Sequence, residues 1–310
     1  MSRKTSTHEQ VVAKLSKINA AVKQGKSLLS ACKEAGMSEQ GYLRLRKEYG
    51  EVKVGPTGKS PRLALQQDDV RPLVILIVVA LCLVFIHYFS DVWWLAWFLE
   101  SLGLTGLGAD FRATFSGTNP RDLAPLLWWA GISVAGYVVV PVVLITLVWR
   151  QRLAEYGLRW SADWRTLRPY LAFVVVMAPV VWIASSTDQF QARYPFLNMM
   201  PGESIQSRWL IWESAYFAQF FALEFFFRGF MVLGLKARFG WLSIPVMVVP
   251  YCMIHFAKPM PEAVAAIVAG IALGHLSVKS GTVFWGALLH CTVAVSFDLT
   301  VLLHRGALIL

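Results

Sequence analysis

Long apolar segments follow one another from about residue 73 to residue 303, and they constrain the fold more than any other feature. They cover residues 73–90, 124–149, 170–187, 209–231, 243–257, 263–278 and 282–303. A helix needs about 20 apolar residues to cross a bilayer, and several segments reach that length. Only 15% of the residues are charged, whereas soluble domains average about 25%. The sequence therefore predicts an all-α, polytopic helical membrane protein with about seven or eight spans.

The positions of lysine and arginine predict how these spans are oriented. The loop 150–169 carries five arginines, and Lys236, Arg238 and Lys279 lie between later spans. The loop 91–123 holds more acidic than basic residues. Cytoplasmic loops are enriched in lysine and arginine, so the basic loops are expected inside. We expect a multi-pass protein of a bacterial inner membrane, surrounded by membrane lipid, with its N-terminus in the cytoplasm.

The chain before the spans is polar and basic. Up to Arg71 it contains 14 Lys/Arg against 7 Asp/Glu. Apolar periodicity and turn residues predict three short helices in residues 1–53, which form a small helical head. Residues 54–71, rich in Gly, Pro, Lys and Gln, are expected to be a linker to a membrane domain at 72–310.

Residues 31–50 of the head resemble the DNA-binding helix-turn-helix of insertion-sequence transposases. This resemblance implies that Arg44, Arg46 and Lys47 contact nucleic acid. The alternative is a solvated three-helix head that binds nothing specific, because three basic residues on one helix are common.

The apolar segment 209–231 carries an acid and a base where membrane spans rarely carry either. Glu224 and Arg228 are four residues apart, so they share one helix face in the order that favours pairing. His255 and His290 lie in later segments and, at a rise of about 1.5 Å per residue, come to a similar depth. Ionisable groups persist at membrane depth mainly where they are paired and functional. We expect one intramembrane site.

A buried carboxylate beside imidazoles can hold and deprotonate a water molecule. Asp298 follows His290 by two turns on a similar face and is a candidate supporting residue. Either no cofactor is required, or a divalent metal such as zinc binds Glu224, His255 and His290, although no H-E-x-x-H arrangement is present. The alternative is that Glu224 and Arg228 form a structural pair and the histidines are packing residues.

Three motifs carry a resemblance to a known family. Glu224-x-x-x-Arg228-Gly229, then Tyr251-x-x-x-His255, then His290 after a glycine-rich span are similar to the CAAX-protease and bacteriocin-processing (CPBP) family of intramembrane endopeptidases. The resemblance covers a motif core at about 150–303. It implies that Glu224 activates water with His255 and His290 assisting, and that Arg228 and Tyr251 support them.

The sequence departs from the family pattern at three positions. Leu223 stands where the family has the first of two glutamates, Tyr251 replaces a phenylalanine, and Ala294 replaces an asparagine. One hypothesis is an endopeptidase that cleaves a membrane-associated or lipidated protein. A second is a catalytically degenerate relative that binds a partner or peptide. A third is a membrane-tethered regulator whose head binds DNA.

Overall fold

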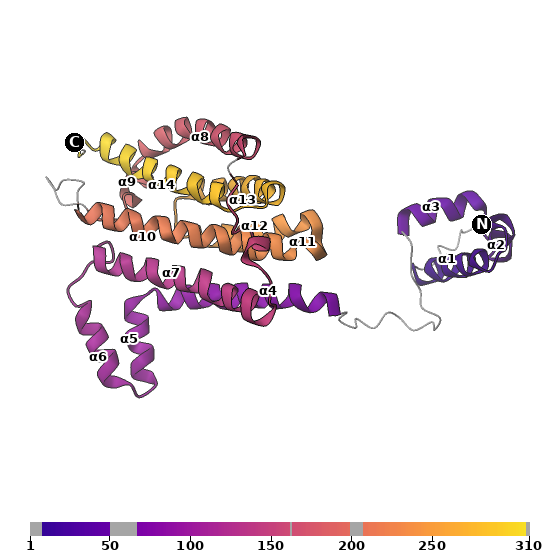
Figure 1. The fold of residues 1–310 in the computed structure, drawn as a ribbon, viewed down its shortest axis with the longest axis horizontal. Helices are drawn as coiled ribbons and strands as arrows, with labels where there is room; N and C mark the ends of the chain where they lie inside the picture. Colours follow the sequence, from indigo (N-terminus) through magenta and orange to yellow (C-terminus); the bar gives the residue numbers. More distant parts are fainter. Residues whose placement is uncertain (1–7, 50–66, 162, 199–206, 308–310) are drawn as a thin grey trace, which may run out of the picture. The chain divides into compact units, whose positions relative to one another are not determined.

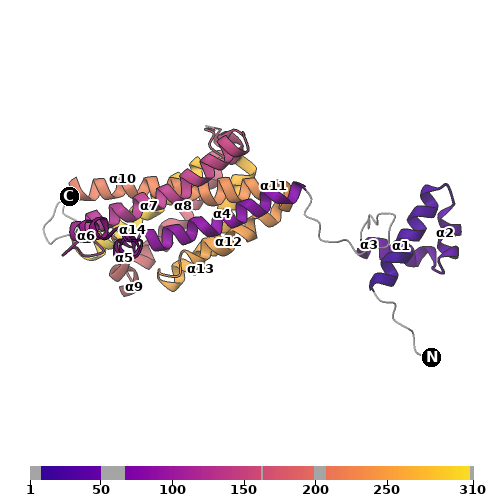
Figure 2. The same cartoon turned by 90° about the horizontal axis from the view of Figure 1, so that it is seen from below.

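The computed structural model of the chain describes residues 8–49, 67–161, 163–198 and 207–307. It divides into two compact units, 1–64 and 65–310. Every regular element in the described ranges is a helix, which confirms the predicted all-α class. Figures 1 and 2 show the helices of each unit.

The first unit is a three-helix head made of α1 (His8–Lys23), α2 (Leu28–Glu34) and α3 (Glu39–Tyr49). Ser27 caps α2, since its hydroxyl accepts a hydrogen bond from the amide of Ser30. The helices pack around the buried residues Leu15, Ile18, Ala31, Cys32 and Tyr42. Most of the predicted linker lies outside the described residues, and residues 67–71 begin a long helix instead.

The second unit contains the long helices α4 (Gln67–Phe89), α7 (Leu123–Val143), α8 (Trp164–Ser185), α10 (Ser207–Glu224), α13 (Met260–Ser280) and α14 (Phe284–His304). In Figure 1, α4, α7, α10, α14 and α8 follow one another across the bundle, and each packs on the next. Shorter helices connect them at one end of the bundle: α5 (Val92–Ser101), α6 (Thr105–Thr114) and α9 (Asp188–Arg193). A short 3-10 helix, η2 (Leu153–Tyr156), lies in the basic loop.

Six described segments are long and apolar enough to cross a membrane: Val70–Phe89, Leu123–Val148, Trp164–Ser185, Arg208–Met253, Met260–Ser280 and Phe284–His304. The protein is therefore a helical, multi-pass membrane protein, as predicted, with six candidate spans in the described residues instead of the seven or eight expected. Arg208–Met253 runs through α10, the π-helical η3 (Phe225–Leu233), α11 (Gly234–Phe239), η4 (Gly240–Leu242) and α12 (Ser243–Met253).

This long segment turns back on itself near Gly240, whose φ is 53°. After the turn, α12 packs against both η3 and α13. With 11 residues, α12 rises only about 16 Å, roughly half of a bilayer core. The chain after α12 therefore begins at about half the depth of the bilayer core, and His255 is buried there.

The loop between α7 and α8 packs beneath η3. Gly229 of η3 lies so close to Tyr156 that a Cβ added there would overlap the carbonyl oxygen of that residue. Gly157 has a φ of 85°, and its carbonyl accepts a hydrogen bond from the amide of Val283. These contacts fix the start of α14 relative to η3. They therefore hold together the two elements that carry Arg228 and His290.

Candidate active site

Glu224 stands at the junction of α10 and η3 and forms the centre of a buried cluster. Its Oε1 lies 3.1 Å from Nη1 of Arg228 and 3.1 Å from Nδ1 of His290. The side chains of Glu224 and Arg228 are both 0% exposed. Three residues from η3, α10 and α14 thus meet at one carboxylate oxygen.

Arg228 also connects η3 to α12. Its guanidinium carbon lies 4.0 Å from the centre of the Tyr251 ring, and that ring is buried. A cation over an aromatic face gains energy when both are shielded from water. Arg228 therefore neutralises Glu224 on one side and contacts α12 on the other.

Gly286, one turn before His290, lets α14 approach the carboxylate. A Cβ at this position would lie 2.8 Å from Oε2 of Glu224. Within the described part of the chain, Oε2 has no hydrogen-bond partner. The glycine thus permits the close packing that brings His290 to Glu224.

Both predicted histidines line one cavity of about 420 Å³. The Nδ1 of His255 lies 2.8 Å from the carbonyl oxygen of Tyr251. Because a carbonyl only accepts, Nδ1 carries the hydrogen and Nε2 is left as an acceptor. The His290 side chain is 18% exposed, and its ring stacks on Phe220 with the ring centres 4.5 Å apart.

Neighbouring residues on α10 face different environments. Leu223 lines the cavity, whereas Glu224 is enclosed and does not line it. One residue step turns a helix by about 100°, so this difference is expected for adjacent positions. At the position where the family pattern has its first glutamate, the cavity is thus lined by a leucine. Glu224 does not line the cavity and contacts one of its lining residues, His290.

Two polar residues in the cavity wall were missed by the sequence reasoning. Gln219 and Ser133 line or border the cavity, and each has a buried side-chain oxygen without a partner in the described ranges. Gln219 precedes Leu223 by four residues, about one helical turn, so both lie on the same helix face. A polar residue on that face could have indicated that Gln219 belongs to the site.

Asp298 does not join the Glu224 cluster. It is buried beside Glu213 of α10, and neither carboxyl group has a hydrogen-bond donor among the described residues. Spacing suggested that Asp298 supports His290, but no contact between these two residues is found in the described ranges.

The predicted nucleic-acid residues belong to the other unit. Arg44 and Arg46 are exposed on α3, and the side chain of Lys47 lies outside the described residues. Their contact with DNA stays a prediction.

The predicted zinc ligands do not form a ligand set. In the described ranges, no group of three or more His, Cys, Asp or Glu side chains is arranged to hold a metal ion. Oε1 of Glu224 is already occupied by Arg228 and His290.

Residues 205–296 match a family model described as Rce1-like, type II CAAX prenyl endopeptidase. The matched stretch contains Glu224, Arg228, Tyr251, His255 and His290, and it supports a CAAX-protease-like intramembrane endopeptidase in general. Searches of the curated proteins and of the solved structures found no match. The family match does not reach the head, and no comparison supports its resemblance to transposases.

Proposed function

We propose that the membrane unit is an intramembrane endopeptidase in which His290 is the general base and Glu224 positions it. The observation that carries this proposal is the 3.1 Å contact between His290 Nδ1 and Glu224 Oε1 at the wall of the cavity. A carboxylate accepts hydrogen bonds, so Nδ1–H donates and Nε2 is the acceptor. An imidazole held in this tautomer can take a proton from water.

The reaction requires water, a peptide carbonyl and the leaving amine in one cavity. Nε2 of His290 takes a proton from water, and the resulting hydroxide attacks the carbonyl carbon. Glu224 stabilises the imidazolium that forms, as the carboxylate does in an Asp–His pair. When the C–N bond breaks, His290 returns the proton to the amine, and a carboxylic acid and an amine are released.

Other cavity residues have complementary roles. The side-chain amide of Gln219 can donate to the oxyanion, and Nε2 of His255 can accept a hydrogen bond from the attacking water. Arg228 forms an ion pair with Glu224 and holds its carboxylate in place. The substrate class proposed is a membrane-associated or lipidated protein, since it must reach a site within the bundle.

A second function is favoured by one specific observation. Leu223 gives the cavity wall an apolar side chain where the family pattern has a glutamate. A relative without that carboxylate would hold a peptide or partner in the cavity without cleaving it.

One experiment separates the two functions. Wild type, His290→Ala and Leu223→Glu are reconstituted in proteoliposomes with a library of membrane peptides, and mass spectrometry identifies the products. The proposed function predicts cleavage by wild type and loss by at least about 100-fold in His290→Ala, as expected for removal of a general base. If only Leu223→Glu cleaves peptides, the wild-type protein is a binding protein and the proposed endopeptidase function is wrong.

A further inference from the structure

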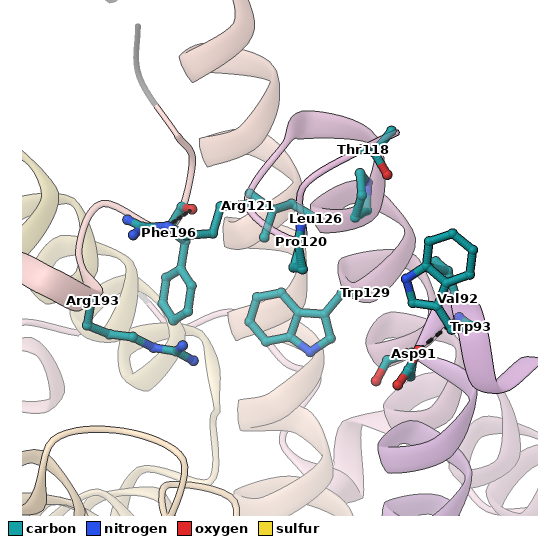
Figure 3. Close-up of a pocket in the computed structure, with 12 residues that line it drawn as sticks. Asp91, Val92, Trp93, Thr118, Pro120, Arg121, Leu126, Trp129, Arg193 and Phe196 are labelled. Carbon is teal, nitrogen blue, oxygen red and sulfur yellow. Dashed lines mark hydrogen bonds between the residues drawn. The ribbon is translucent and has the colours of Figure 1, made fainter. Parts of the chain in front are cut away.

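The cavity that holds the two histidines continues toward the end of the bundle where α4 ends and α7 begins. A second cavity of about 340 Å³ lies there. The two cavities share Ser90, Trp129, Arg193 and Phe196 as lining residues. The second cavity, which we call the mouth, therefore adjoins the cavity that His290 lines. Figure 3 shows the residues around the mouth.

The loop 192–197, which includes the last two residues of α9, forms one side of the mouth and is held by several elements. Arg121 donates hydrogen bonds to three carbonyl oxygens of this loop. Arg305, after α14, donates to the carbonyl oxygen of Tyr194 at 2.8 Å. The Tyr194 hydroxyl donates to the carboxylate of Glu262 at 2.8 Å. The loop is thus fixed before any ligand arrives.

Arg193 is presented by this loop. Its guanidinium carbon lies 4.7 Å from the centre of the Phe196 ring. In Figure 3 the side chain runs beneath that ring toward Trp129, and it lines both cavities. Within the described part of the chain, no carboxylate forms an ion pair with Arg193.

The charges around the mouth are mostly positive. Burial, followed by the nearby charges of Arg305 and Arg193, lowers the pKa of Arg121. Lys258 lines the cavity that holds the two histidines and forms an ion pair with Glu262 at 2.6 Å.

One carboxylate, Asp91, also lines the mouth, where its Oδ1 accepts hydrogen bonds from the amides of Trp93 and Trp94. Arg193, an exposed residue, is thus a cation at the mouth that has no ion pair among the described residues.

We propose that Arg193 binds a carboxylate of the substrate, either its C-terminus or an acidic side chain, and so selects which peptide bond reaches His290. The planar guanidinium fork matches the two oxygens of a carboxylate. The fixed loop keeps the cost of ordering this contact low. This inference deepens the proposed endopeptidase function and rests on it for the role of His290.

The test measures binding rather than cleavage. A fluorescent alanine–leucine peptide is prepared with a free C-terminal acid, with a C-terminal amide, and with an amide plus a glutamate at the last position. Each is titrated against the full-length Glu224→Gln variant in neutral lipid nanodiscs. A hydrogen bond to a charged group is worth about tenfold in affinity or more, so the acid or glutamate peptide should bind about tenfold tighter than the plain amide.

Substitutions at Arg193 in that background identify the partner. Arg193→Gln should remove the difference between the peptides, whereas Arg193→Lys should keep part of it. Arg112→Gln is the matched control, because Arg112 is an arginine of α6 that pairs with Glu100 at 2.9 Å and does not line either cavity. It should leave the difference intact.

Equal dissociation constants for the three peptides would overturn the inference. An equal loss for all three in Arg193→Gln would also overturn it, because it would mean a structural role. Loss of the carboxylate preference when anionic lipid replaces neutral lipid would identify a lipid headgroup as the occupant. If the preference holds but wild type cleaves no peptide in the screen, the proposed function fails and the binding role of Arg193 stands.

Discussion

Glu224 carries a charge at a position with no exposed surface, where an ion is stable only when it is paired. Arg228 and His290 both pair with it through Oε1. Such a buried cluster differs from an exposed ion pair such as Lys26–Glu34, which contributes little to stability. The loss of one member leaves the others unpaired, so the cluster responds to substitution as a unit.

Arg228→Met should destabilise the protein by about 3–5 kcal/mol, because it leaves the Glu224 charge buried without its main partner. Adding Glu224→Gln to that variant removes the orphaned charge and should restore part of the loss. Thermal unfolding of wild type, both single variants and the double variant in detergent measures this coupling. Strictly additive losses would mean that the two residues do not interact.

The π-helical segment η3 places this cluster. It begins directly after Glu224 and contains Arg228 and Gly229. Such segments are rare within helices and frequently occur at functional sites. The packing of Gly229 on the Tyr156 carbonyl holds η3 against the basic loop.

Gly229→Ala should therefore destabilise the bundle by at least about 1–3 kcal/mol, since the added methyl group must displace backbone atoms. Gly131→Ala in α7 is the control, because a Cβ there meets nothing within 4 Å. Melting temperatures of the two variants provide the comparison. Equal stability of the two variants would show that η3 does not depend on this contact.

Periodicity and hydropathy were sufficient to predict the helical elements and the Glu224–Arg228 pair, because four residues complete about one helical turn. They could not predict that Leu223 faces the cavity while Glu224 is enclosed, since the rotation of a span is set by its neighbours. The position of Asp298 beside Glu213 was not predicted, for the same reason. Spacing along one helix does not identify the partner on another.

The whole bundle has two ends, one with the basic loop 150–169 and one with the mouth. Arg71 lies 5.2 Å from the Trp149 ring at the end that carries the basic loop 150–169. Trp128 donates to the carbonyl oxygen of Phe89 at the other end, next to the mouth. If the basic loop is cytoplasmic, as the positive-inside rule predicts, the mouth opens away from the cytoplasm.

Single-cysteine variants test this orientation. In a background in which the four native cysteines are replaced, Ser116→Cys near the mouth should react with a membrane-impermeant maleimide in intact cells. Lys279→Cys, an exposed position at the basic end, should react only after the membrane is opened. The reverse pattern would place the mouth in the cytoplasm.

The central claim is that a buried carboxylate positions an imidazole for peptide hydrolysis within the membrane. The most direct measurement compares kcat of wild type and Glu224→Gln on one cleaved peptide in proteoliposomes, with equal folded fractions verified by thermal unfolding. The account predicts a kcat lower by about 100-fold or more in Glu224→Gln, because the glutamine cannot stabilise the imidazolium. Equal kcat values in the two folded proteins would contradict it.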